Sequence, residues 1–84
     1  MTLGVPVRRG EGVITSVRIT DAVRQPGSLR GLKLYDVMQS DVDSLIKMIP
    51  RVTWPAFMEH ETLTMDNRDF VALTTGIVSF LVPN

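Results

Sequence analysis

Residues 26–55 read PGSLRGLKLYDVMQSDVDSLIKMIPRVTWP, and this stretch holds two helical patterns together with the residues that start and stop them. The clearer pattern begins at Ser40 or Asp41, whose side-chain oxygen can cap the first free N–H groups. Four apolar residues follow at the i, i+3, i+4 and i+7 positions of one helix face: Val42, Leu45, Ile46 and Ile49. Pro50 disfavours the helical conformation at the residue before it. The pattern therefore predicts a short helix from Asp41 to about Ile49.

Weaker helical patterns lie on both sides of this helix. Upstream, apolar residues recur at every third position, with Ser28 as a candidate cap and Gly31 as a weak point in the first turn. These apolar residues are Leu29, Leu32, Tyr35 and Met38. Downstream, we expect Thr53 or Trp54 to cap a further short helix over residues 56–63.

The N-terminal residues predict a β-hairpin. Pro6 places its segment at a sheet edge, because proline cannot donate to a central ladder, and the glycine-rich residues 9–12 supply a turn. The return strand over residues 13–20 alternates, which predicts one core face and one solvent face. The face with Val13, Thr15, Val17 and Ile19 opposes the face with Ile14, Ser16, Arg18 and Thr20. An isolated hairpin is marginally stable in water, so it must pack on the helices or gain a strand from a partner.

The last predicted helix has the best-specified start. Asp66 is a candidate N-cap, Asp69 adds negative charge to the first turn, and Met65 can meet Phe70 as a hydrophobic staple. Its apolar stripe consists of Phe70, Leu73, Ile77 and Phe80 or Leu81, widened by Val71, Val78 and Val82. This wide apolar surface predicts either a central core helix or a helix with one side against a partner. Pro83 is expected to end it.

Together these patterns predict an α+β fold that is mainly α, with an N-terminal β-hairpin followed by three or four short helices. A chain of 84 residues has room for one small core, so residues 1–84 are expected to form a single domain. Within it, residues 1–27 form the hairpin arm and linker, and residues 28–84 form the helical region.

The residue types exclude several kinds of site. The chain has no cysteine and one histidine, and the sequence HETLT around His60 lacks the second histidine of a zinc-binding helix. The G-x-G at residues 10–12 lacks the third glycine and the lysine of phosphate-binding loops. No nucleophile is placed beside a general base. We therefore expect neither an enzyme nor a bound metal or cofactor, and His60 should be a surface residue.

Hydropathy and charge give expectations about location and association. No apolar run approaches the roughly 20 residues that span a bilayer, and the N-terminus lacks the apolar core of a signal peptide, so neither export nor membrane insertion is expected. The net charge is zero, but residues 1–33 hold six basic against two acidic side chains and residues 34–84 hold three against seven. Copies of the chain could associate head to tail through these ends, or the charges could simply neutralise one another within a monomer.

Several short segments, in order, resemble the tail assembly chaperones of contractile-tailed and Mu-like bacteriophages. The segments are Leu29-Arg30-Gly31-Leu32, Asp41-Val42-Asp43, Leu45, Ile49-Pro50-Arg51-Val52-Thr53, Pro55, Leu63, Asp69 and Phe80-Leu81. The resemblance covers residues 13–81. The chain departs from the pattern at Trp54, which is larger than expected there, and at Asn67, where a proline is expected.

This resemblance implies a function and a set of partners. Proteins of this family bind the long tail tape-measure protein, keep it soluble, help to recruit tail-tube subunits and are absent from the mature virion. They act in the host cytoplasm, and many are made in two lengths, the longer by a programmed frameshift. By resemblance, this chain is expected to be the short form and to meet the tail-tube protein through the longer form. A homo-oligomer is expected from its small size and uneven charge.

Four residues are candidate contacts for such a partner: Trp54, Phe57, Met58 and Met38. Aromatic side chains dominate both interface hot spots and cores, and methionine fills gaps in cores as well as in adaptable surfaces. The alternative function is a small helix-turn-helix DNA-binding protein, with residues 41–49 as the reading helix. Asp41 and Asp43 argue against it, because DNA-binding elements are usually basic where they touch phosphates, and so we expect no nucleic-acid partner.

Overall fold

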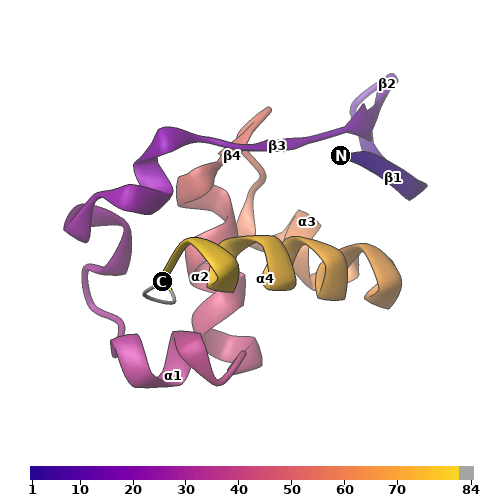
Figure 1. The fold of residues 1–84 in the computed structure, drawn as a ribbon. Helices are drawn as coiled ribbons and strands as arrows, with labels where there is room; N and C mark the ends of the chain where they lie inside the picture. Colours follow the sequence, from indigo (N-terminus) through magenta and orange to yellow (C-terminus); the bar gives the residue numbers. More distant parts are fainter. Residues whose placement is uncertain (82–84) are drawn as a thin grey trace.

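Helix α2 (Val42–Val52) contributes four fully buried side chains, Leu45, Met48, Ile49 and Val52, to the core of the computed structural model, which describes residues 1–81 (Figure 1). The strands are β1 (Thr2–Arg9), β2 (Gly12–Ser16), β3 (Arg18–Ile19) and β4 (Thr53–Trp54). The other helices are α1 (Leu34–Met38), α3 (Glu59–Thr64) and α4 (Asn67–Leu81), with single 3₁₀ turns at η1 (Asp21–Arg24) and η2 (Pro26–Leu29). The predicted class, α+β and mainly α with an N-terminal hairpin, is confirmed.

The start of α2 agrees with the prediction from sequence. Asp41 is the N-cap residue, and its carboxylate accepts hydrogen bonds from the backbone N–H of Ser44 at 3.0 Å and from the Ser44 hydroxyl at 2.9 Å. This contact satisfies one of the N–H groups that the first helical turn leaves free.

We expect Asp41→Ala to lower the free energy of unfolding by about 1 kcal/mol, because alanine cannot cap the helix. Chemical denaturation followed by circular dichroism measures this loss. Asp41→Asn is the control, since its side-chain oxygen can still accept the Ser44 N–H. A loss of equal size in Asp41→Asn would show that the carboxylate charge matters rather than the cap.

The end of α2 differs from the prediction. The helix continues through Pro50 to Val52, although proline was expected to stop it at Ile49. Continuation buries Val52 completely, and the Thr53 hydroxyl donates to the Ile49 carbonyl at 2.8 Å, which satisfies an acceptor at the helix end. Tertiary burial therefore outweighs the local cost of a proline.

The buried face of α2 is also displaced from the predicted one. Leu45 and Ile49 are fully buried as expected, whereas Val42 is 55% exposed and Ile46 is only partly buried. Met48 and Val52 complete the buried stripe instead. The core-facing stripe thus begins at Leu45, which leaves Val42 and Ile46 at the side of the helix.

The region upstream of α2 forms less α-helix than predicted. The α-helix comprises only Leu34–Met38, and Gly31 adopts a φ of +78°, a conformation that a helix interior does not contain. Val37 is the buried residue of α1, whereas the predicted face residues Tyr35 and Met38 are exposed. The i+3 pattern therefore spans a 3₁₀ turn, a reversal at Gly31 and a short helix rather than a single helix.

The hairpin turn forms where the sequence predicted it. β1 and β2 are antiparallel, Arg9 pairs with Gly12, and Gly10 has a φ of +59°. The predicted alternation over residues 13–20 is wrong, because Ile14 and Val17 are buried while Val13 is exposed. The pairing register shifts between Thr2 and Val7, and such an irregularity changes the phase of inward and outward side chains.

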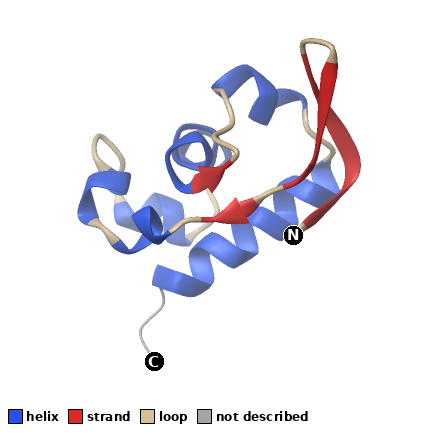
Figure 2. Cartoon of the chain, turned by 90° about the horizontal axis from the view of Figure 1, so that it is seen from above, coloured by secondary structure: helices blue, strands red, loops and turns tan. Residues whose placement is uncertain are grey.

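A second small sheet joins the hairpin arm to the end of α2 (Figure 2). Arg18 pairs with Trp54 and Ile19 with Thr53, so Thr53–Trp54 forms strand β4 rather than a helix cap. A residue before proline prefers extended backbone, which suits Trp54, the residue before Pro55, to this strand. As a result α3 begins at Glu59 and not near residue 56.

Helix α4 closes the core. Its cap is confirmed, because the Asp66 carboxylate accepts the backbone N–H of Arg68 at 2.9 Å, and Leu73 and Ile77 are buried as predicted. Phe70 and Leu81 are partly buried and pack against the core, whereas Phe80 is exposed, so of the two predicted alternatives Leu81 completes the stripe. The predicted contributions of Val82 and Pro83 lie outside the described residues.

Asp69 has a role that the sequence did not indicate. Its buried carboxylate accepts the backbone N–H groups of Gly4 at 2.8 Å and Val5 at 3.1 Å. These bonds attach β1 to the first turn of α4, near the position where the register of the hairpin shifts. Asp69 therefore joins strand β1 to the first turn of α4.

Candidate partner-binding surface

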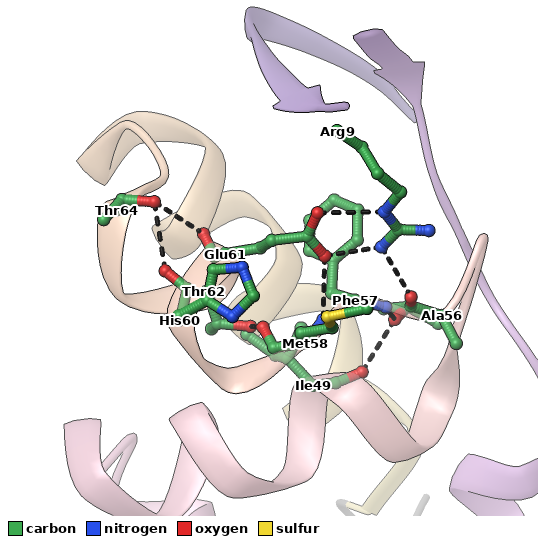
Figure 3. Close-up of polar contacts among 10 residues, drawn as sticks. Arg9, Ile49, Ala56, Phe57, Met58, His60, Glu61, Thr62 and Thr64 are labelled. Atoms are coloured by element: carbon green, nitrogen blue, oxygen red, sulfur yellow. Dashed lines mark hydrogen bonds and ion pairs between the residues drawn. The ribbon is translucent and has the colours of Figure 1, made fainter. Parts of the chain in front are cut away.

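An ion pair between the partly exposed Arg9 and the buried Glu61 attaches the hairpin arm to α3 (Figure 3). The Glu61 carboxylate accepts hydrogen bonds from Nε and Nη2 of Arg9, at 2.9 Å for Nε, and from the backbone N–H of Met58 at 2.9 Å. Arg9 Nη2 also donates to the Ala56 carbonyl at 2.8 Å. The hydrogen bond from Arg9, followed by the Met58 N–H, lowers the pKa of Glu61 to about 2 despite its desolvation.

Thr53 holds the loop that follows α2. Its hydroxyl donates to the Ile49 carbonyl and accepts the Phe57 N–H at 3.3 Å. The Ile49 carbonyl at this end of α2 therefore accepts a hydrogen bond from Thr53, and the Met58 N–H in the loop donates to Glu61. Their arrangement fixes the loop over residues 54–58 and decides which of its side chains reach solvent.

The four predicted contact residues do not form a single patch. Phe57 is 2% exposed and belongs to the core, so its predicted role as a surface contact is corrected. The extended loop before α3 turns Phe57 inward, and Trp54 and Met58 are exposed. Met38 is also exposed but lies in α1, beyond the opposite end of α2 from Trp54 (Figure 1).

A groove between three helices is the more coherent apolar surface. This helical groove is a hollow of about 180 Å³ lined by Val42, Ile46, Thr62, Leu63, Met65, Asn67 and Phe70. Val42 from α2 and Leu63 from α3 are 55% and 64% exposed. Its lining contains no charged side chain. An amphipathic helix could place its apolar face in such a groove.

Trp54 belongs to a different hollow. This strand hollow has a volume of about 480 Å³ and is lined by Met1, residues 13–18, Trp54 and Pro55. Trp54 is 61% exposed there, and Val13 and Met1 are exposed beside it. The strand hollow therefore combines apolar side chains with the polar side chains of Thr15, Ser16 and Arg18.

The described residues were also compared with what a metal site or a membrane-spanning helix requires. Residues 1–81 contain no group of three or more histidine, cysteine, aspartate or glutamate side chains that could hold a metal ion. His60 is exposed, as expected from sequence. None of the helices described is long and apolar enough to cross a bilayer.

The geometry does not favour the helix-turn-helix alternative. Its reading helix would be α2, whose N-terminal end carries Asp41 and Asp43. The N-terminal residues of a recognition helix enter the major groove between the phosphate backbones. Carboxylates at that end of the helix would be repelled by the phosphates.

Two proteins of Escherichia phage P2 are similar to almost the whole chain. The tail assembly protein E is 44% identical over 84 residues, which are 100% of this chain and 90% of that protein. The tail assembly protein E′ is 44% identical over 82 residues, which are 98% of this chain and 56% of that protein. No protein-family model matches the chain. No solved structure matches it.

Proposed function

This chain belongs to the family of the phage P2 tail assembly proteins E and E′, and on that basis we propose that it is a tail assembly chaperone that binds and solubilises the tape-measure protein. The names of these relatives, from a contractile-tailed phage, support a role in phage tail assembly rather than in catalysis. The chaperone acts in the host cytoplasm, helps the tail tube to assemble and is absent from the mature virion.

The helical groove is the observation that best supports this proposal. Its lining is uncharged and mainly apolar, and two of the lining residues, Val42 and Leu63, are more than half exposed. Binding of an amphipathic helix to a groove is driven by burial of such side chains, and it needs no catalytic group. A long helical protein offers many such apolar faces, so several copies of one small domain could cover it.

The tail-tube protein is the second proposed partner, and it would be met by a longer, frameshifted form of the chain. The P2 protein E′ supports this division of roles, because the segment similar to our chain makes up only 56% of its length. The remaining part of such a longer form would be available for the tube protein.

Co-expression with the tape-measure protein encoded nearby in the same genome tests the function. We expect the tape-measure protein to become soluble and to co-elute with this chain in size-exclusion chromatography at both low and high salt, because apolar contacts are not screened. A tape-measure protein that stays insoluble while this chain elutes alone would overturn the proposal.

A substitution in the groove tests the surface. Leu63→Glu places a charge at an exposed groove position, and we expect it to weaken co-elution by about tenfold or more while leaving the fold intact. Val71→Glu is the matched control, because Val71 is 60% exposed on α4 and does not line the groove. Equal losses in both variants would argue against the groove.

The residues predicted from sequence receive their own test. Trp54→Ala and Met58→Ala truncate exposed side chains outside the helical groove, and Met38→Ala does so beyond the other end of α2. If the groove is the binding surface, these three variants keep the tape-measure protein soluble. Loss of binding in Trp54→Ala alone would identify the strand hollow as the contact instead.

A further inference from the structure

Three basic side chains line one hollow at the C-terminal end of α2. This basic hollow, of about 470 Å³, is lined by Arg30, Gly31, Lys47, Pro50, Arg51 and Glu59. Arg30, Lys47 and Arg51 are exposed, and Glu59 is the single acidic residue in the lining. The ion pair within residues 1–81 joins Arg9 and Glu61, so none of these four charges has an ion-pair partner in that part of the chain. The hollow therefore presents an excess of positive charge to solvent.

The backbone holds the Arg51 guanidinium in this hollow. Its Nη1 donates to the Ser28 carbonyl at 3.1 Å and to the Arg30 carbonyl at 2.7 Å. A guanidinium has five N–H donors, so Arg51 keeps donors for a further acceptor. A carboxylate suits these donors, because the planar fork of arginine can bind both of its oxygens. Since Arg51 is already held in place, binding a carboxylate costs little further ordering of this side chain.

The basic hollow continues the helical groove along the seam between α2 and α3. Val42 and Ile46 line the groove and Pro50 lines the basic hollow, and these residues are four apart, so they form one row along α2. In α3, Leu63 lines the groove and Glu59, four residues earlier, lines the basic hollow. Successive turns of both helices therefore lead from the uncharged groove to the positive charges.

We propose that the tape-measure segment in the helical groove is an amphipathic helix whose acidic residues, about two turns from its apolar anchors, lie in the basic hollow. The acidic helix is a more specific form of the proposed tape-measure partner, and so it rests on the proposed function. Its spacing follows from α2, along which Arg51 lies about 8 Å from Ile46 and about 14 Å from Val42. Because the groove lining carries no charge, the acidic residues give the bound helix one direction along the seam.

A nucleic acid fits this face less well than a peptide helix does. The adjoining hollow, of about 180 Å³, has Lys33 and Lys47 balanced by Asp36 and Asp43 in its lining and carries no net charge. A nucleic acid repeats its negative charge along the whole backbone, which would set phosphates against Asp36 and Asp43. A helix with one or two carboxylates needs only the basic hollow, and its apolar face meets the mainly apolar groove. Charge complementarity therefore favours an acidic amphipathic helix.

Peptides that tile the tape-measure protein encoded nearby test this chemistry, with binding to the purified chain measured by fluorescence anisotropy. We expect the peptides that bind to carry aspartate or glutamate about two turns from an apolar stripe. Replacing those acids by lysine should weaken binding by about tenfold, because like charges then meet in the hollow. High salt should weaken the binding of the acidic peptides without abolishing it, since the apolar contact is not screened. Peptides that bind equally well after the replacement would overturn the proposal.

Substitutions in the basic hollow identify the contact. Arg30→Glu and Lys47→Glu are each expected to weaken binding of the acidic peptides by about threefold to tenfold. Arg8→Glu is the matched control, because it makes the same charge change at an exposed position of β1 that lines neither the groove nor the basic hollow. Glu59→Gln should tighten binding instead, since it removes the one acidic side chain from the lining. Unchanged affinity in both Arg30→Glu and Lys47→Glu would contradict the assignment.

A charge reversal separates a direct contact from a change in fold. The double variant Arg30→Glu, Lys47→Glu should bind the lysine-substituted peptide more tightly than the acidic one, which a loss of folding cannot produce. Circular dichroism checks that the variant is folded. A DNA oligonucleotide that binds the wild type and not the double variant, while the affinity for the acidic peptides is unchanged, would assign the basic hollow to phosphates and overturn the proposal.

The solubility of the co-expressed tape-measure protein distinguishes the failure of the acidic helix from the failure of the proposed function. If the wild type and the double variant solubilise it equally and bind its peptides with equal affinity, the chaperone function stands and the acidic helix is wrong. If the tape-measure protein stays insoluble with the wild type and none of its peptides binds, both are wrong.

Discussion

Leu45→Ala is expected to lower the free energy of unfolding by about 3 kcal/mol. Leu45 is fully buried on the core-facing stripe of α2, so truncation removes apolar burial and leaves a cavity that the surrounding helices fill only in part. An 84-residue domain has roughly 4–12 kcal/mol of stability in total. The substitution should therefore remove a large share of it.

Urea denaturation followed by circular dichroism measures this loss. Val42→Ala is the matched control, because it truncates an apolar side chain three residues earlier in the same helix at a position that is mostly exposed. We expect Val42→Ala to change the stability by less than about 0.5 kcal/mol. Similar losses at the two positions would mean that α2 packs with a different face than described.

We expect the free energy of unfolding of Glu61→Gln to depend much less on pH in the acid range than that of the wild type. The pKa of Glu61 is about 2 in the folded chain, while an unperturbed glutamate has a pKa of about 4.3. A carboxyl group whose pKa is lower in the folded than in the unfolded chain stabilises the fold at pH values above its unfolded pKa. For Glu61 this stabilisation is lost as the pH falls toward about 2. Glutamine cannot carry the charge, so its variant lacks this contribution at every pH.

At neutral pH we expect Glu61→Gln to be less stable than the wild type by about 1–2 kcal/mol, a range reduced because Arg9 is partly exposed to solvent. The difference should narrow between pH of about 4.5 and about 2, which denaturation curves at several pH values would follow. Glu59→Gln is the control, since Glu59 is exposed two residues earlier in α3. Parallel pH profiles for wild type and Glu61→Gln would contradict the assignment.

The parts of the fold that were predicted from sequence depend on neighbours in the chain. The cap at Asp41 acts on Ser44 three residues away, and the cap at Asp66 acts on Arg68 two residues away. The hairpin turn at Gly10 is equally local. Cap and turn chemistry of this kind is visible in a short window of sequence.

The parts that were missed depend on distant partners. Asp69 binds the N–H of Gly4 across 65 positions, and Arg9 binds Glu61 across 52. The continuation of α2 through Pro50 likewise follows from burial against other elements and not from local preference. A single sequence holds no local signal for such contacts.

The same distinction applies to the candidate surfaces. Trp54, Met58 and Met38 are exposed, and Phe57 could not be separated from them by sequence alone because its burial depends on the loop before α3. The helical groove needs three helices to form. Val42 and Ile46 belong to α2 and Leu63 to α3, so no short window of sequence groups the residues that line it.

The exposed position of Trp54 makes the chain's sole tryptophan an optical reporter of contact and a poor reporter of unfolding. An indole surrounded by water emits at long wavelength whether the chain is folded or not, so heating should move the emission maximum very little. A partner that covers the strand hollow should shift the emission to shorter wavelength, whereas one that fills only the helical groove should leave it unchanged. The colour of the emitted light thus distinguishes which side of the molecule is occupied.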